Sequence, residues 1–184
     1  MLGKIVATVK GICPLLQHKD DGNREKVSDP GSPEAQNKEF KDAQYRNGKG
    51  LFQPSEHFER CFELAGSQFK FKGKLTYSSI IKGGIVIEPQ EILHKIQKIV
   101  PFAKFVRIPP GKRGARVLST RALLENWELD FVINILNDAI NFEDLKQIVE
   151  YAGGYIGIGD WRPKFGRFEV IKFAKLEDKK TKRS

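Results

Sequence analysis

The chain has 184 residues, which suits one full domain, and 40% of them are apolar, including 13 phenylalanines, so wholesale disorder is excluded. No run approaches the roughly 20 apolar residues of a membrane span, the start lacks the apolar core of a signal peptide, and two cysteines give neither a disulfide framework nor a zinc motif. The use of cysteine favours a reducing cytoplasm. Lysine and arginine outnumber the acids by 32 to 23, a formal charge of +9, so we expect the partner to be nucleic acid rather than an acidic membrane or an acidic protein.

The first half of the chain predicts one strand and two helices around a polar stretch. The strand is expected at residues 2–12, where β-branched residues dominate until Pro14. Residues 17–50 are polar, so we expect a mobile insertion there, with a short helix around residues 34–45. A longer helix is predicted at residues 54–66, between a first-turn Pro54 and a capping Gly66. Its apolar residues recur at helical spacing and are expected in the core: Phe58, Cys61, Phe62 and Ala65.

The second half alternates short helices and strands. A short helix is predicted at residues 76–81, a strand at 85–87 and a helix at 92–100, where a strand stays open as an alternative. Strands are predicted at 102–108, 127–136 and 165–176, and Asn141 is a good N-cap for a helix between the last two. The reduced order (strand, helix, strand, strand, helix, strand) is typical of an α+β fold of the ferredoxin-like or RRM-like kind, an antiparallel sheet with two helices on one face. We therefore expect one RRM-like domain at residues 1–178, with the insertion after its first strand and a basic, disordered tail at 179–184.

The segment 153–168, which joins the last helix to the last strand, is rich in glycine and carries positive charge. Gly157, Gly159 and Gly166 permit close approach of another backbone, and backbone N–H groups suit phosphate oxygens. Its other candidate contacts are the cations and rings Tyr155, Trp161, Arg162, Lys164 and Arg167, which suit phosphates and unpaired bases. The alternative is a turn that only reverses the chain and docks Trp161 in the core.

A second basic segment, residues 104–121, contains no acid. Its candidate phosphate-binding residues are Lys104, Arg107, Lys112, Arg113, Arg116 and Arg121. An acid-free basic loop between two strands favours contact with a nucleic-acid backbone, although a solvated loop is the alternative.

Catalytic patterns are sparse. His18 and His57 are the candidates for a general acid or base in RNA cleavage, with Tyr45 or a lysine assisting, against the simpler interpretation of solvated or capping histidines. No motif for a metal or a cofactor is present.

Three segments resemble a known group of proteins. They are Gly-Ile-Cys-Pro-Leu-Leu at residues 11–16, Phe-Gln-Pro-Ser at 52–55 and Gly-Ile-Gly-Asp-Trp-Arg-Pro-Lys-Phe-Gly-Arg-Phe at 157–168. Together they resemble small phage-encoded proteins, which are in turn similar to the RAMP superfamily of CRISPR-associated RNA-binding proteins, especially the crRNA backbone subunits. The resemblance implies an RRM-like domain and a C-terminal glycine-rich loop that contacts RNA. It implies that Gly157, Gly159, Gly166 and Arg167 match that loop, and that Lys112, Arg113 and Arg116 lie in a loop that reaches the RNA backbone.

Three functions stay open at this point. The first is a protein that binds single-stranded RNA or DNA through its backbone, either alone, as copies assembled side by side along the strand, or within a RAMP-like complex. The second is a metal-independent RNA endonuclease of the RAMP type. The third is a viral subunit that binds other proteins. No membrane partner is expected from any of them.

Overall fold

The computed structural model describes residues 2–19, 31–107 and 116–176. Three sequence-based expectations therefore fall outside the described residues in whole or in part. They are the basic tail at 179–184, the middle of the polar insertion, and the positions of Lys112 and Arg113.

The central sheet of the fold has four antiparallel strands in the spatial order β12-β1-β11-β7. They are β1 (Gly3–Gly11), β7 (Ile85–Glu88), β11 (Glu128–Ile135) and β12 (Phe168–Lys175). Strands β1 and β11 lie side by side in the middle of the sheet, and β7 and β12 form its edges. This arrangement of two split βαβ units confirms the predicted ferredoxin-like α+β fold.

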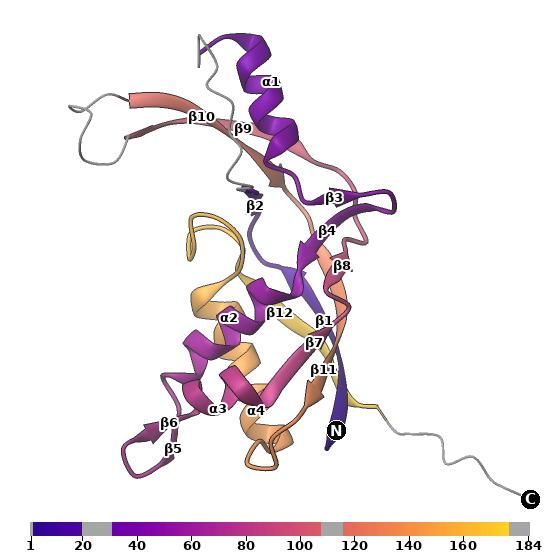
Figure 1. Cartoon of the computed structure of the whole chain (residues 1–184), viewed down its shortest axis with the longest axis vertical. Helices are drawn as coiled ribbons and strands as arrows, with labels where there is room; N and C mark the ends of the chain where they lie inside the picture. The colour runs from indigo at the N-terminus through magenta and orange to yellow at the C-terminus, as the bar shows by residue number, and fades with distance from the viewer. Residues whose placement is uncertain (1, 20–30, 108–115, 177–184) are drawn as a thin grey trace, which may run out of the picture.

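Three helices pack on one face of this sheet: α2 (Ser55–Gly66), α3 (Tyr77–Gly84) and α4 (Phe142–Tyr151), as Figure 1 shows. The apolar residues predicted for the core are buried in α2, and the Phe58 ring lies 4.6 Å from that of Phe131 and 5.7 Å from that of Phe168. Asn141 caps α4 as predicted, since its Oδ1 accepts a 2.8 Å hydrogen bond from the Asp144 N–H. None of the helices in the described part of the chain has the length and apolar character that crossing a bilayer requires.

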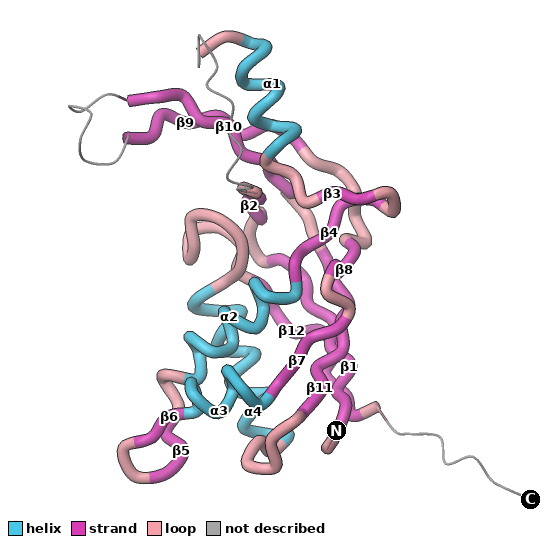
Figure 2. Tube along the Cα trace, viewed as in Figure 1, coloured by secondary structure: helices cyan, strands magenta, loops and turns pink. Residues whose placement is uncertain are grey.

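A second sheet extends the molecule beyond the first. It has the order β2-β10-β9 and consists of β2 (Leu15–Gln17), β9 (Val100–Arg107) and β10 (Arg116–Leu124). The insertion contributes helix α1 (Pro33–Asp42), which lies along β10 in Figure 2 and confirms the predicted short helix. We call these four elements the upper lobe, and the four-stranded sheet with α2, α3 and α4 the core lobe. Between them lies a small sheet of β3 (Arg46–Asn47), β4 (Gly50–Pro54) and β8 (Glu91–Leu93).

Three stretches differ from the predictions. The helix expected at residues 92–100 is wrong, because Ile92 is buried between exposed Glu91 and Leu93 and this two-residue alternation places β8 against β4. Part of the expected basic loop is strand β10, paired with β9 from Arg116 to Leu123. A lysine-rich hairpin of β5 (Lys70–Lys72) and β6 (Leu75–Thr76), which the periodicity does not predict, precedes α3.

Candidate nucleic-acid interface

Residues 157–167, here called the glycine loop, follow a π-helical turn (Ala152–Ile156) at the end of α4. The loop closes on itself through a 2.9 Å hydrogen bond from the Ile158 N–H to the Gly166 carbonyl. It also docks on the chain leading into β2, because the Gly166 N–H donates to the Pro14 carbonyl at 2.8 Å and the Asp160 N–H to the Leu16 carbonyl at 2.9 Å. These bonds make the glycine loop a fixed part of the fold.

The glycines of this loop allow its positive φ angles and its close backbone contacts. Gly166 has a φ of +75°, and a Cβ there would lie 1.7 Å from the Ile158 carbonyl oxygen. Gly159 has a φ of +78°, and a Cβ there would lie 2.5 Å from the Leu16 carbonyl oxygen. The N–H of Gly157 is bonded to the Ala152 carbonyl at 2.8 Å. Since the N–H groups of Gly157 and Gly166 are already used within the chain, the loop presents its side chains rather than these amides to a ligand.

Trp161 stands where the glycine loop meets the β9–β10 hairpin. Its backbone has a φ of +53°, and its N–H donates to Asp160 Oδ1 at 3.0 Å. The indole is half-buried and packs edge-on against Phe102 of β9 at 5.9 Å, with Phe165 completing the cluster. The Lys104 Nζ lies 5.4 Å from the centroid of the indole. The two segments singled out in the sequence therefore share one surface.

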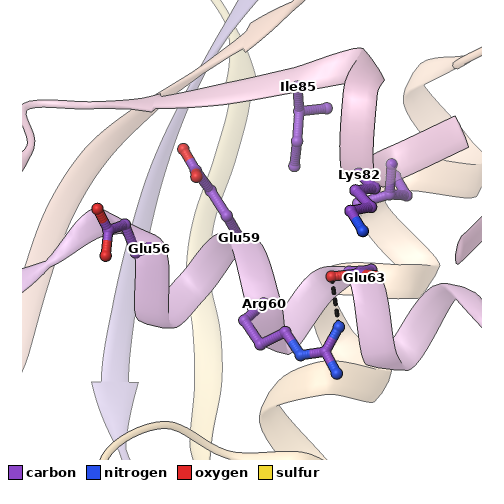
Figure 3. Close-up of a pocket in the computed structure, with 7 residues that line it drawn as sticks. Glu56, Glu59, Arg60, Glu63, Lys82 and Ile85 are labelled. Carbon is purple, nitrogen blue, oxygen red and sulfur yellow. Dashed lines mark hydrogen bonds and ion pairs between the residues drawn. The ribbon is translucent and has the colours of Figure 1, made fainter. Parts of the chain in front are cut away.

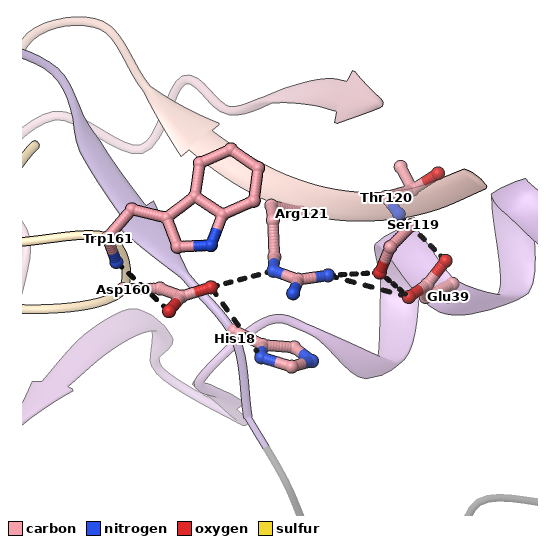
Figure 4. Close-up of polar contacts among 7 residues, drawn as sticks. All are labelled: His18, Glu39, Ser119, Thr120, Arg121, Asp160 and Trp161. Atoms are coloured by element: carbon pink, nitrogen blue, oxygen red, sulfur yellow. Dashed lines mark hydrogen bonds and ion pairs between the residues drawn. The ribbon is translucent and has the colours of Figure 1, made fainter. Parts of the chain in front are cut away.

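Arg121 lies under this surface and links three distant segments, as Figure 4 shows. It is only 7% exposed, and its Nε donates to Asp160 Oδ2 at 2.7 Å. Its Nη1 lies 3.6 Å from Glu39 Oε1 of α1, and the other oxygen of Glu39 accepts from the Thr120 N–H at 2.7 Å. His18 Nδ1 lies 3.6 Å from the same Asp160 oxygen. Arg121 was predicted to face phosphate, but its guanidinium is held by the protein's own carboxylates.

Some of the remaining predicted cations are exposed, and the others lie outside the described part of the structure. Five side chains are exposed and form no ion pair with any described residue: Lys104, Arg116, Arg162, Lys164 and Arg167. Lys104 and Arg116 come from the hairpin and the other three from the glycine loop. The side chain of Arg107, like Lys112 and Arg113, lies outside the described part of the structure. Both segments therefore contribute exposed positive charge, and the Lys104 Nζ lies beside the Trp161 ring.

The open face of the four-stranded sheet is a different kind of surface. In RRM domains, aromatic residues on the two middle strands of this face stack on bases. Here the outward positions of β1 and β11 hold no aromatic residue: Lys4, Val6, Thr8, Lys10, Glu128, Asp130, Val132 and Asn134. Lys95 neutralises two of the acids, at 2.5 Å from Glu128 and 2.8 Å from Asp130. RRM-type stacking on this face is therefore not available.

A polar cluster joins the two lobes behind the glycine loop. The Gln17 Nε2 donates to the Phe52 carbonyl at 2.8 Å and lies 3.4 Å from His94 Nε2. Burial lowers the pKa of His94 to about 4, and its Nδ1 has no partner among the described residues. His57 contacts Gln53 and the Tyr45 ring, and burial, with Arg162 nearby, lowers its pKa. Both imidazoles are consequently neutral at pH 7.

A shallow hollow on the outer side of α2 is acidic and does not belong to this surface. Figure 3 shows Glu56, Glu59 and Glu63 along it. Glu63 pairs with Arg60 at 2.7 Å, and Glu59 Oε1 accepts from the Ile87 N–H at 3.0 Å. Carboxylates repel phosphate, so this side of α2 is unsuited to a polyanion.

Comparison with known proteins shows the fold. No family model matches the chain, and no match is found among curated proteins. Among solved structures, the chain is similar to one from a Type III-B Cmr-beta complex bound to cognate target RNA, with a TM-score of 0.53 and 10% identity over 96% of this chain. A CRISPR protein from Archaeoglobus fulgidus aligns over 95% of this chain with a TM-score of 0.44 and 14% identity. The chain spans 62% and 64% of the length of these two neighbours. The first likeness, at 10% identity, shows a fold shared with a chain of the Type III-B Cmr-beta structure.

Several residues of the site are not evident from the sequence. Phe102 and Phe165, which hold the indole, belong to an ordinary strand pattern and to a loop. Glu39 is one acid among many in a polar insertion, and only the packing of α1 on β10 brings it to Arg121. Asp160 was part of the resembling segment, but nothing in that segment indicates its partner.

Proposed function

We propose that this protein binds single-stranded nucleic acid, RNA above all, across the surface where the glycine loop meets the β9–β10 hairpin. The observation that carries the proposal is the half-buried Trp161, which lies where the two basic segments meet and has the exposed Lys104 Nζ 5.4 Å from its ring. These two segments carry five exposed cations that lack carboxylate partners among the described residues. A neighbour with the same fold belongs to a complex bound to target RNA, which favours RNA over DNA as the ligand.

Each group has a role in this proposal. Arg116, Arg162 and Arg167 bind phosphate oxygens through paired N–H groups, and Lys104 and Lys164 act as point charges. A base stacks on the side of the Trp161 ring that Lys104 now covers, because the exposed lysine can move to a phosphate whereas Arg121 is fixed by its ion pairs. Arg107, Lys112 and Arg113, which belong to the same acid-free segment, extend the track of positive charge. Gly157, Gly159 and Gly166 shape the loop, and Arg121 positions it.

Fluorescence-anisotropy titration of labelled single-stranded RNA, single-stranded DNA and duplex tests the proposal. Joint substitution of Arg113→Ala and Arg116→Ala is expected to weaken binding to all sequences alike and to lower the slope of log K against log salt by about 1.4 on single strands. Trp161→Ala is expected to weaken single strands about tenfold and duplex much less. Arg60→Ala, on the acidic side of α2, is the control. Unchanged affinity in both test variants would overturn the proposal.

The same titration tests whether copies assemble side by side. With strands of about 10, 20 and 40 nucleotides, the number of bound copies rises with length if they do. One copy on every strand would show that the protein binds singly.

One observation favours metal-independent RNA cleavage as a second candidate function. His18 lies 3.6 Å from Asp160 beside the proposed binding surface, a carboxylate–imidazole pair that can move a proton. Labelled RNA incubated in EDTA is cleaved by the wild-type protein and not by His18→Ala if this function is correct. Absence of any product from the wild-type protein would eliminate it.

A further inference from the structure

A second basic element lies at the opposite end of the molecule from the β9–β10 hairpin (Figure 1). It is the β5–β6 hairpin, whose lysines Lys70, Lys72 and Lys74 are all exposed. The sequence from residue 67 to residue 87 contains no Asp or Glu, and none of the three ammonium groups forms an ion pair with a described residue. This concentration of unpaired positive charge is not used by the surface around Trp161.

The hairpin is fixed to the core lobe at its base. The Phe71 ring packs edge-on against Tyr77 at 5.3 Å, and the Tyr77 N–H donates to the Phe69 carbonyl at 3.0 Å. The Tyr77 hydroxyl donates to Asp144 of α4, and burial, together with this bond, raises the pKa of Tyr77 to about 12. The phenol therefore stays protonated and keeps its bond, so the three lysines are presented from a defined place.

Aromatic rings connect this hairpin to the start of the glycine loop. Phe69, next to β5, lies edge-on to Tyr151 at 5.6 Å. Tyr151 is stacked on Tyr155, with ring centroids 4.7 Å apart and planes inclined by 29°. Tyr155 is 69% exposed, so one face of its ring is covered by Tyr151 and the other is open to solvent. An exposed ring already stacked on one neighbour is suited to stack on a second planar group.

We propose that Tyr155 and the β5–β6 hairpin form a second contact surface for the same single strand, with a base on Tyr155 and phosphates on Lys70, Lys72 and Lys74. This inference rests on the proposed function. The stacked, exposed ring favours nucleic acid over an anionic membrane, which would need the lysines alone. Because the β5–β6 hairpin and the β9–β10 hairpin lie at opposite ends of the molecule, with Tyr155 two residues before the glycine loop, a strand must be long enough to reach both hairpins.

The test compares strands of about 8 and about 30 nucleotides, sizes chosen on either side of one binding site. The triple variant Lys70→Ala, Lys72→Ala, Lys74→Ala is expected to bind the long strand at least tenfold more weakly, with a salt slope lower by about two, and the short strand as the wild type does. A matched variant, Lys41→Ala, Lys49→Ala, Lys98→Ala, removes the same charge from exposed lysines elsewhere and is expected to change long-strand affinity less than threefold.

The role of the ring is tested separately. Tyr155→Ala is expected to weaken the long strand about tenfold, whereas Tyr155→Phe, which keeps the ring, is expected to bind as the wild type does. Circular dichroism confirms that each variant is folded.

The outcomes separate the two proposals. If the wild-type protein binds neither the short nor the long strand, the proposed function itself is overturned. Normal long-strand binding by the triple variant or by Tyr155→Ala would overturn only the second surface. The proposal of a second nucleic-acid surface would also be overturned if the triple variant lost binding to phosphatidylserine vesicles while keeping its affinity for RNA.

Discussion

In the core lobe, helices meet the sheet through apolar rings and aliphatic chains, as where Phe58 lies between Phe131 and Phe168. In the upper lobe, α1 meets β10 through the carboxylate of Glu39, and the glycine loop meets β10 through the guanidinium of Arg121. Apolar burial involves no titrating group and is not screened by salt, whereas ion pairs are screened by salt and buried imidazoles respond to pH. The same chain therefore combines a robust scaffold with a surface whose geometry depends on a few charges.

The difference also shows how a site can be built on a ferredoxin-like fold without using its sheet. The open face of the core lobe carries paired charges, as in Lys95 with Glu128. The candidate surface instead forms at the junction of the two lobes, where Trp161 is held from both sides. Variants that affect one lobe and not the other test this difference between the lobes.

The largest effect is expected from Arg121→Met. This change leaves the carboxylates of Asp160 and Glu39 partly buried without their partner, and we expect a loss of about 3–5 kcal/mol in the free energy of unfolding. Urea denaturation measures it, and hydrogen exchange should show the loss first in α1 and β10. Arg116→Met, an exposed change on the same strand, should cost less than about 0.5 kcal/mol. Equal urea midpoints for the two variants would refute the assigned role of Arg121.

The second effect concerns pH. A pKa of about 4 for His94 in the folded state, against 6.5 in the unfolded chain, means that the unfolded state binds the proton more tightly. Stability is therefore full above pH 6.5 and falls as the pH drops toward 4, by up to about 3 kcal/mol. Urea midpoints measured between pH 7 and 4 check this. His94→Gln should remove most of the slope, and an unchanged slope would mean that other groups cause it.

A third prediction concerns the turn of the glycine loop. Gly166→Ala places a methyl group against the Ile158 carbonyl at a φ of +75°, and we expect a cost of about 1–3 kcal/mol with weaker RNA binding. Gly154→Ala is the control, because a Cβ there meets nothing within 4 Å. Thermal melting and anisotropy measure both variants. Similar behaviour of the two would contradict the tight closure of the loop.

The smallest effects are expected from the helix caps, one in each lobe. Asn141→Ala at α4 and Ser32→Ala at α1 each remove a side-chain acceptor for a backbone N–H and should cost about 1 kcal/mol. If the core lobe governs overall unfolding, only the α4 change lowers the urea midpoint, and the α1 change appears as faster local hydrogen exchange. A lower midpoint for both would show that the lobes unfold as one unit.

Local patterns predicted much of the core lobe. Apolar and polar residues alternate along β1 and β11, and Phe58, Phe62 and Ala65 recur at helical spacing, because each segment buries one face against a single core. Such a pattern can be recognised from the sequence of each segment alone. The stretch after Glu91 was misjudged because Ile92, Ile96 and Ile99 fit a helix, while pairing with β4 favours a strand. Propensity over a short apolar run does not settle that competition.

The cations and the tryptophan of the candidate surface can be picked out in the sequence, but the contacts that hold them in place cannot. Lys104 and Trp161 stand out by charge and by neighbouring glycines. The burial of Arg121 depends on Glu39 and Asp160, which are distant in the sequence, so no local pattern marks it. The stacking of Tyr155 on Tyr151 is likewise not evident from the sequence, because it depends on the π-helical turn after α4.

The central position of β1 also bears on how the protein is made. This strand is synthesised well before its two neighbours in the sheet, β11 and β12, and Gly3 pairs with Ile135. The nascent chain must keep β1 unpaired until β11 has been synthesised, and contacts of such long sequence separation slow folding. A chain interrupted before β11 would therefore leave β1 without a partner strand and prone to aggregation.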